Sequence, residues 1–355
     1  MAENDLVEVL ENFNPEKKKN PILSVGIDCG TMFIALARSD SDEVKLIRNA
    51  YLSLDKEEIS LNDLVDINYV TAEDGSLYII GDDAFKLANL FNKKISRPME
   101  KGMISPKEVN AIDILTLMIK SLLGDIKDKD VYCSYSVPAE AIDETRSIIY
   151  HEKVFSKIFS SLGINNTSLN EAAAIVYSEA GHEKFSACSI SFGAGMVNCA
   201  ILYHGIEVLK FSTARSGDYI DHSVAESLNI VQNRVTSVKE KFLNLEAGTS
   251  GETDKKKKRI LEALSYYYDS LINYTIKKII KEFEDKVEIE MEEPIDIVLS
   301  VGTSMPAGFV NLFKSVISNY KLPFEVNEIR HAKNPLTAVA KGLLIKTMSD
   351  VGDKK

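Results

Sequence analysis

The sequence predicts an α/β protein built from two related domains with a cleft between them. Three observations favour this architecture: a length of 355 residues with 45% hydrophobic content, an order of strands and helices that occurs twice, and a glycine-rich turn at the same place in each repeat. The length suits two domains better than one. Two similar units of this kind are expected to lie side by side.

The first repeat begins with three short apolar segments separated by tight turns, a pattern typical of antiparallel strands. They are ILSVGI (22–27), FIALAR (33–38) and EVKLIR (43–48). The residues from Ser105 to Glu108 match a capping box with proline at the first helical position. This pattern predicts a helix of about four or five turns. A strand at 131–137, a helix at about 140–162 and a helix from about Glu171 are predicted to follow.

The second repeat has the same order of elements. Its strands are predicted at 187–192, 197–203 and 206–213, its helices at about 218–229, 234–246 and 256–284, and a further strand at 295–301. A helix is then predicted from Pro306. The last helix is predicted to have Asn334 as its N-cap and Pro335 at its first position.

These repeats set the expected domain boundaries. The expected units are a flexible N-terminal tail (1–21), a first domain (22–170), a second domain (171–347) and a C-terminal tail (348–355). An insertion at about 51–100 interrupts the first domain, and a helical, charged insertion at about 214–290 interrupts the second. Within the second insertion, residues 247–258 are expected to form an exposed loop with solvated lysines.

Charge and cysteine content argue against several classes of protein. The net charge of −11 disfavours a nucleic-acid partner or an anionic membrane surface. The cysteines have no C-x-x-C spacing and are expected to be buried strand thiols; they are Cys29, Cys133, Cys188 and Cys199. The histidines lack metal-ligand spacing. The N-terminus does not resemble a signal peptide, and no apolar segment is long enough to cross a bilayer, so we expect a cytoplasmic protein without a transmembrane segment.

Three glycine-containing turns carry the candidate chemistry. In GIDCGT (26–31), Gly30 would let backbone N–H groups approach phosphate, and Asp28 would hold a hydrated Mg²⁺. SFGAGM (191–196) lies at the matching place in the second repeat, and VLSVGTSMPAGF (298–309) follows a strand and opens a helix. Each turn alone is also typical of an ordinary hairpin or strand–turn–helix corner. Two turns that face each other across a cleft are what favour a phosphate site.

The order of these motifs resembles the actin/Hsp70/hexokinase superfamily. Its phosphate 1, connect 1, phosphate 2, adenosine and connect 2 motifs are matched by VGIDCGT, NEAAAIVYSEAG (170–181), ISFGAGMVN, VLSVGTSMP and NPLTAVAKGLL (334–344). Within the superfamily, the sequence is most similar to bacterial actins of the MreB and MamK kind, also at 78–105 and at SGDYIDHSV (216–224). The resemblance covers about 22–347 and implies two RNase H-like α/β domains with a nucleotide cleft between them.

The resemblance also implies roles for individual residues. Asp28 matches the acid that organises Mg²⁺ and water, and Glu171 matches the acid that positions the attacking water. The implied nucleotide contacts are Gly30, Thr31, Gly193, Ala194 and Gly195 at the phosphates, Gly217 and Asp218 nearby, Lys239 and Glu240 on the ribose helix, and Gly302, Thr303 and Ser304 at the adenosine motif. The implied cofactors are ATP, or another nucleotide, and Mg²⁺.

The sequence departs from the family pattern mainly in charge. The phosphate-2 acid of the family is Ser191 here, its following threonine is Met196 and its next acid is Asn198. Val301 stands for the first glycine of the adenosine pair, and Ala172 for the connect-1 proline. The turn keeps its glycines, so we expect it to bind phosphate. Loss of one positioning or electrostatic group commonly costs about a hundred- to a thousand-fold in rate, so only slow hydrolysis is expected.

The sequence leaves three functions open. The favoured one is an actin-like protein that forms filaments through a head-to-tail contact under the control of its nucleotide. A non-polymerising regulator or scaffold with a degenerate ATPase site is favoured by the substitutions at 191, 196 and 198. A small-molecule kinase or an Hsp70-like chaperone comes last, because no sugar-binding cluster or large C-terminal module is evident. The N-terminal tail and residues 247–258 are the expected contact sites for protein partners.

Overall fold

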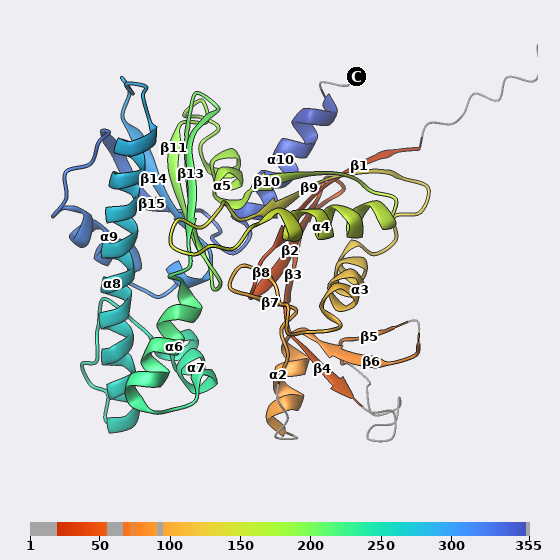
Figure 1. The fold of residues 1–355 in the computed structure, drawn as a ribbon, viewed down its shortest axis with the longest axis horizontal. Helices are drawn as coiled ribbons and strands as arrows, with labels where there is room; N and C mark the ends of the chain where they lie inside the picture. The colour runs from red at the N-terminus through yellow and green to blue at the C-terminus, as the bar shows by residue number, and fades with distance from the viewer. Residues whose placement is uncertain (1–19, 55–66, 73, 91–94, 353–355) are drawn as a thin grey trace, which may run out of the picture.

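The computed structural model describes residues 20–54, 67–72, 74–90 and 95–352. These residues form two α/β domains, each built on a five-stranded mixed sheet (Figure 1). The expected two-domain α/β architecture is therefore confirmed. Within the described residues, no helix combines the length and the apolarity needed to cross a bilayer.

The first sheet has the strand order β10-β9-β1-β2-β3. Its strands are β1 (Ile22–Cys29), β2 (Phe33–Arg38), β3 (Ser41–Arg48), β9 (Asp130–Val137) and β10 (Asn165–Asn170). The first three pair antiparallel, whereas β9 and β10 are parallel to β1. Strand β1 is buried from its second residue onward, as expected for a central strand between parallel and antiparallel neighbours.

The second sheet repeats this arrangement in the order β13-β12-β11-β14-β15. Its strands are β11 (Ala187–Phe192), β12 (Val197–Tyr203), β13 (Ile206–Thr213), β14 (Ile295–Ser300) and β15 (Val326–His331). The β1–β2 and β11–β12 turns thus occupy equivalent places in the two sheets. Strands β10 and β15 were not predicted from the sequence.

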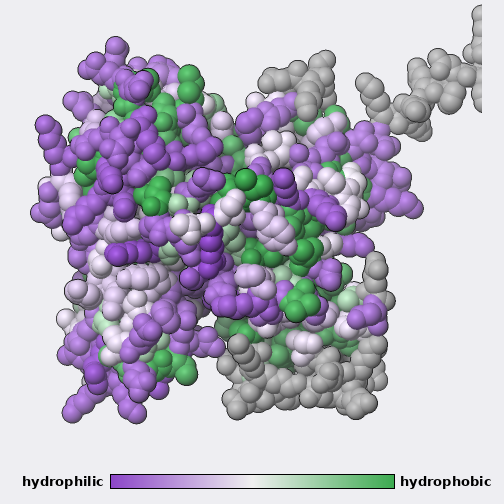
Figure 2. Space-filling model, viewed as in Figure 1, coloured by the Kyte–Doolittle hydropathy of each residue, from purple (hydrophilic) through white to green (hydrophobic). Residues whose placement is uncertain are grey.

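The insertion in the first domain contains a small sheet, a helix and a hairpin. Its elements are β4 (Tyr51–Leu54), β5 (Tyr69–Thr71), β6 (Leu77–Ile80), α2 (Gly81–Leu90), β7 (Met99–Glu100) and β8 (Met103–Ile104). The insertion in the second domain is helical, with α6 (Gly217–Leu228), α7 (Gln232–Phe242) and α8 (Lys255–Lys286). On the face shown in Figure 2, hydrophilic side chains cover much of this domain.

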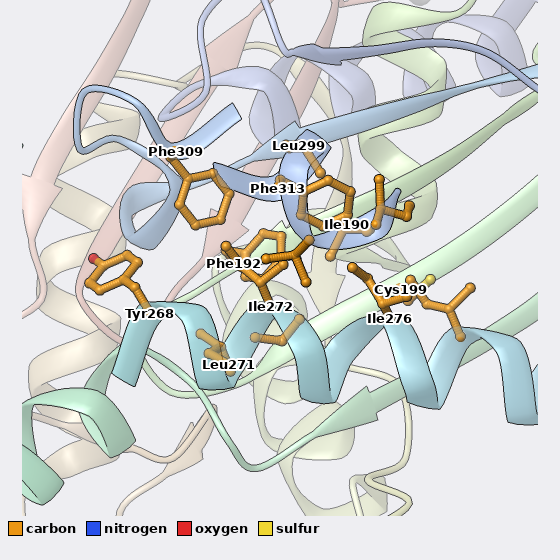
Figure 3. Close-up of a cluster of buried hydrophobic side chains, with 14 of the residues drawn as sticks. Ile190, Phe192, Cys199, Tyr268, Leu271, Ile272, Ile276, Leu299, Phe309 and Phe313 are labelled. Carbon is orange, nitrogen blue, oxygen red and sulfur yellow. The ribbon is translucent and has the colours of Figure 1, made fainter. Parts of the chain in front are cut away.

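The largest core lies beneath α8 in the second domain. Apolar side chains of α8 face the second sheet and α9 (Phe309–Ile317), among them Leu271, Ile272 and Ile276 (Figure 3). Phe192, at the end of β11, packs edge-on against Phe309. Because β11 leads directly into the glycine-rich turn, this packing fixes the base of that turn.

Two helices connect the domains at the closed side of the cleft. They are α5 (Glu171–Glu179) and α10 (Ala338–Gly352), and both lie between the two sheets in Figure 1. A Cβ atom on Gly342 would lie 1.7 Å from the carbonyl oxygen of Ala174, so these helices cross at backbone contact. The remaining helices, α3 (Ala111–Leu123) and α4 (Ile149–Ser161), cover the first sheet.

Three predicted helix starts are wrong. Glu108 accepts a hydrogen bond from the hydroxyl of Tyr51 (2.8 Å), and α3 begins only at Ala111. The expected helix start near 140 is extended chain, since Ile142 N–H donates to Ser212 on β13 (2.9 Å). Residues 335–337 form a turn, in which the N–H groups of Thr337 and Ala338 donate to the carbonyl of Asn334, and α10 begins at 338 rather than at 335.

Two segments expected to be irregular are partly helical. Lys255 to Lys258 form the first turn of α8, because the Asp254 side chain accepts from the N–H groups of Lys256 and Lys257. Helix α10 continues to Gly352, into the expected C-terminal tail. The expected N-terminal tail lies almost entirely outside the described residues. All four cysteines are free and buried, as predicted.

Candidate functional site

A cavity of about 490 Å³ lies between the two domains. This volume falls in the range of small-molecule sites. The first domain contributes the β1–β2 turn and the end of β9, and the second contributes the β11–β12 turn, part of α7 and residues 301–303 and 305–307. The two glycine-containing turns at equivalent places in the repeats therefore face the same space.

The first turn presents a buried carboxylate. Asp28, near the end of β1, accepts a hydrogen bond from the hydroxyl of Ser136 (2.8 Å), and this hydroxyl also accepts from the N–H of Cys29 (2.7 Å). Burial raises the pKa of Asp28 to about 6, and the Ser136 hydrogen bond opposes the rise. A Cβ on Gly30 would lie 2.5 Å from the carbonyl oxygen of Phe33, so the tight turn requires glycine.

The second turn packs closely against the side chain of Thr31 in the first turn and against the β7–β8 hairpin. A Cβ on Gly195 would lie 2.1 Å from the nitrogen of Gly102, in the β7–β8 hairpin, and 2.4 Å from Oγ1 of Thr31. The Thr31 hydroxyl accepts a hydrogen bond from Gly102 N–H (3.1 Å). The helix α6 supports the same turn, since the N–H of Gly217 donates to the carbonyl of Gly193 (3.1 Å).

Glu171 lies at the start of α5, between the two turns. The N-cap of this helix is Asn170, which fixes the position of the first helical residue. The Oε1 atom of Glu171 accepts hydrogen bonds from Ser191 Oγ and from Asn198 Nδ2, both 2.7 Å long. Burial raises the pKa of Glu171 to about 8, the nearby charge of Asp28 adds to this rise, and the two hydrogen bonds oppose it.

Helix α7 forms another part of the cavity wall. Lys239 and Glu240 both line it, but each is already paired. The ammonium of Lys239 lies 2.8 Å from the buried carboxylate of Asp221. Glu240 pairs with Arg48 of the first domain across the cleft (3.3 Å). Apolar side chains also line the cavity, among them Leu243, Met305 and Leu336.

Most residues that the sequence proposed for the site line the cavity. They are Asp28, Gly30, Thr31, Glu171, Gly193, Ala194, Gly195, Lys239, Glu240, Gly302 and Thr303. The hydroxyl of Thr303 donates to the carbonyl of Gly193 (3.0 Å), which joins the third turn to the second. Residues that were predicted from separate motifs, far apart along the chain, therefore line one cavity.

Three proposed residues lie behind the cavity wall instead. Gly217 and Asp218 support the second turn through their backbone N–H groups, and the Asp218 carboxylate pairs with Arg97 (3.3 Å). The Ser304 hydroxyl donates to the carbonyl of Val301 (2.7 Å) and lies 2.9 Å from His331 Nε2. In this structure these residues support the walls of the cavity.

Sequence reasoning missed Ser136 and Arg48, which also line the cavity. The parallel pairing of β1 with β9 sets Ile27 beside Tyr135, which brings Ser136 next to Asp28. Ser136 lies at the end of the predicted strand 131–137, but only the register of β9 with β1 shows that it contacts Asp28. Arg48 ends β3 and carries no local motif.

Comparison with known proteins places this geometry in a fold family. A family model described as Volactin matches residues 23–347. No curated protein matches the chain in sequence. The chain is similar in structure to MamK in a double helical filament, with 18% identity, 91% of this chain and 97% of that chain covered, and a TM-score of 0.69.

Two further solved structures are similar over most of their length. MreB5 of Spiroplasma citri bound to ADP has 14% identity, with 94% of this chain and 99% of that chain covered, and a TM-score of 0.64. The ethanolamine utilization protein EutJ from Carboxydothermus hydrogenoformans has 15% identity, with 92% and 90% covered, and a TM-score of 0.51. At these identities the likeness establishes the fold. The chain belongs to the Volactin family and has the two-domain actin-like fold.

Proposed function

We propose that this protein is an actin-like filament protein that binds a nucleoside triphosphate with Mg²⁺ between its domains and hydrolyses it slowly. The bound nucleotide would control head-to-tail self-association. One observation carries this proposal: two glycine turns from different domains and two carboxylates, the buried Asp28 and the half-buried Glu171, line one cavity.

The turns suit a phosphate chain that lies between the domains. Backbone N–H groups in tight glycine turns provide anion-binding sites without side-chain clash. Thr31 and Ala194 lie in the two turns, next to Gly30 and Gly195. A ligand in contact with both turns would stabilise the closed arrangement of the domains, since it binds that arrangement better than an open one.

The donor set fits Mg²⁺ held mainly by the nucleotide. Among the described residues there is no group of three or more His, Cys, Asp or Glu that could hold a metal by itself. Mg²⁺ in nucleotide sites usually takes one or two carboxylates, several waters and the phosphates. Asp28 supplies such a carboxylate, and Ser136 fixes its orientation (2.8 Å). A bound Mg²⁺ would neutralise phosphate charge.

Glu171 is the residue that we assign to the water. It enters the cavity from the start of α5 and lies close enough to Asp28 for their charges to interact. A carboxylate in this place would orient a water towards the terminal phosphate and accept its proton. The nucleoside would occupy the part of the cavity bordered by α7, with Gly302 and Thr303 beside it.

We propose that contacts across the cleft link the nucleotide to assembly. Ion pairs join the domains across the cleft, between Arg48 and Glu240 and between Arg97 and Asp218. The partners from the second domain lie on α7 and at the start of α6, beside the cavity. A ligand that contacts these elements would change the angle between the domains, and with it any contact between subunits.

The similarity to MamK in a double helical filament supports self-association of this kind. The similarity to MreB5 bound to ADP supports nucleotide as the ligand. We place the protein in the cytoplasm. The N-terminal tail and the segment 247–258, which is largely exposed up to the start of α8, are proposed contact sites for protein partners.

The second candidate is a regulator or scaffold that binds nucleotide and does not polymerise. The uncharged residues Ser191 and Asn198 favour it, since the related family pattern has acids there. High-speed pelleting of the purified protein over a range of concentrations, with MgATP, MgADP or no nucleotide, separates the two.

A sharp critical concentration that depends on ATP is the expected result. Protein that stays in the supernatant under all three conditions, in a monodisperse state, would contradict the filament proposal and favour the regulator.

A further inference from the structure

Ser191 and Asn198 form a cross-strand pair at the edge of the cavity. They lie directly opposite each other in the register of β11 and β12, and both are fully buried. Side chains of such a pair point to the same face of the sheet. Both donate a hydrogen bond to the same atom, Glu171 Oε1, at 2.7 Å. The two positions that lack the acids of the family pattern therefore supply two donors that converge on one carboxylate oxygen.

The amide of Asn198 has a defined orientation. Its Oδ1 accepts a hydrogen bond from the N–H of Ala139 (2.9 Å), so its Nδ2 must face Glu171. Ala139 belongs to the segment that follows β9 in the first domain. Asn198 thus connects the backbone of the first domain to Glu171, and this connection depends on the two domains being together.

An aspartate at either position could not replace these contacts. A carboxylate at 198 could still accept from Ala139, but it would present a second negative charge, not a donor, to Glu171. An aspartate at 191 would likewise present a negative charge to Glu171 where the Ser191 hydroxyl now donates a hydrogen bond. Neighbouring carboxylates repel and disfavour ionisation of each other. The uncharged pair therefore favours the ionised form of Glu171 and opposes the rise in its pKa that burial causes, so the substitutions do more than remove charge.

The hydrogen bonds leave one carboxylate oxygen available. Within the described part of the chain, both side-chain hydrogen bonds to Glu171 end on Oε1, and Glu171 lines the cavity. Donors that occupy Oε1 fix the rotation of the carboxylate plane. Its Oε2 is then the atom that can accept a hydrogen bond from a water in the cavity.

We infer that Ser191 and Asn198 are positioning residues that hold Glu171 to orient the water which attacks the terminal phosphate. The inference rests on the nucleotide binding proposed above. The water oxygen forms a bond to the terminal phosphorus, and the bond from that phosphorus to the bridging oxygen breaks, with its electron pair staying on the departing nucleoside diphosphate. Glu171 Oε2 accepts a proton from the water and releases it to solvent. The products are nucleoside diphosphate, inorganic phosphate and a proton.

The test uses the full-length protein and measures two quantities, the dissociation constant for MgATP and the single-turnover rate of phosphate release. The variants are Ser191→Ala, which removes one donor, and Asn198→Asp, which keeps the acceptor for Ala139 and replaces the donor with a charge. Loss of a residue that orients a catalytic group typically costs about 10- to 100-fold in activity. We expect rate losses of that size with little change in the dissociation constant.

The control is Ser300→Ala. Ser300 pairs with Ser191 in the adjacent strand β14 and is equally buried, but its hydroxyl donates to the carbonyl of Pro335 (3.0 Å) and not to Glu171. This variant should hydrolyse at the wild-type rate. Ser191→Thr keeps the hydroxyl and should recover most of the rate lost in Ser191→Ala, which a general effect on packing would not produce.

Several outcomes would overturn the inference. They are an unchanged rate in both Ser191→Ala and Asn198→Asp, a faster rate when an acid is placed at 191 or 198, and a wild-type protein that binds MgATP without hydrolysing it. A wild-type protein that binds no nucleotide would overturn the proposed function first, and this result is separate because it appears in the dissociation constant alone.

Discussion

The crossing of α5 and α10 offers a sharp test, because the two helices touch through their backbones. In Gly342→Ala, the added Cβ would lie 1.7 Å from the carbonyl oxygen of Ala174, whereas an ordinary contact begins at 3.4 Å. The helices would have to separate by roughly 1.7 Å at this point. Overpacking of this kind costs about 1–3 kcal/mol, and the better helix propensity of alanine returns about 1 kcal/mol.

We therefore expect Gly342→Ala to lower the stability by about 2 kcal/mol, from the upper end of that range. In domains of this size that corresponds to a fall of about 4–8 °C in the melting temperature. Since α5 begins with Glu171, phosphate release should slow as well. The assay is thermal unfolding, with Gly352→Ala as the control. Gly352 lies in the same helix with nothing within 4 Å of its added Cβ, so this variant should melt near the wild type.

Equal melting temperatures for Gly342→Ala and the wild type would refute the backbone contact and, with it, the account of how the domains are joined. An equal loss in the control would also refute it, because the effect would then belong to the helix in general and not to the crossing.

Three further predictions follow from contacts around the cleft. Arg97→Ala removes an ion pair with Asp218 between the domains, and it should speed release of a fluorescent nucleotide by up to about fivefold, less at high salt; an unchanged release rate would count against this pair as a closing contact. Gly195→Ala would place a Cβ 2.1 Å from Gly102 N and should abolish nucleotide binding in titration calorimetry, so wild-type affinity would contradict the facing turns. Burial lowers the pKa of His151 to about 4 in the folded protein, below the ordinary value of 6.5, so stability present at neutral pH should be lost as pH falls from 6.5 towards 4, by up to about 3 kcal/mol. In His151→Gln, the free energy of unfolding measured in urea should depend less on pH over that range. An equal pH dependence in the variant and the wild type would exclude this histidine as the cause.

Local patterns predicted the strands and the turns well, because alternation and glycine spacing arise within a few residues. The two strand triplets and the glycine turns lie where the sequence placed them. Helix starts were less predictable where a distant contact decides. Glu108 bonds to Tyr51 and does not cap α3, and residues near 142 pair with β13 before α4 begins. A local capping pattern contains no information about partners that are distant in the sequence.

The same division holds at the site. Asp28, Glu171 and the glycines could be found from motifs, because each motif is short and contiguous. The partners of the carboxylates could not, since Ser136 reaches Asp28 only through the parallel register of β9 with β1. Ser191 and Asn198 were visible as departures from a pattern. That both donate to Glu171 follows only from the pairing of β11 with β12.

Lys239 shows a third kind of limit. Its place on the helix beside the cavity was anticipated, and it does line the cavity. Its ammonium, however, is paired with Asp221, which is completely buried on α6. A buried charge requires a partner. The sequence alone does not reveal whether a lysine on such a helix contacts the ligand or neutralises a buried carboxylate.

The most direct test of the central claim is isothermal titration of the full-length protein with ATP, with and without Mg²⁺. The account predicts saturable binding of one nucleotide per chain, tighter with Mg²⁺ and lost in Gly195→Ala. Titration without saturable heat, together with no rise in melting temperature at millimolar MgATP or MgGTP, would contradict the claim that the cavity between the domains is a nucleotide site.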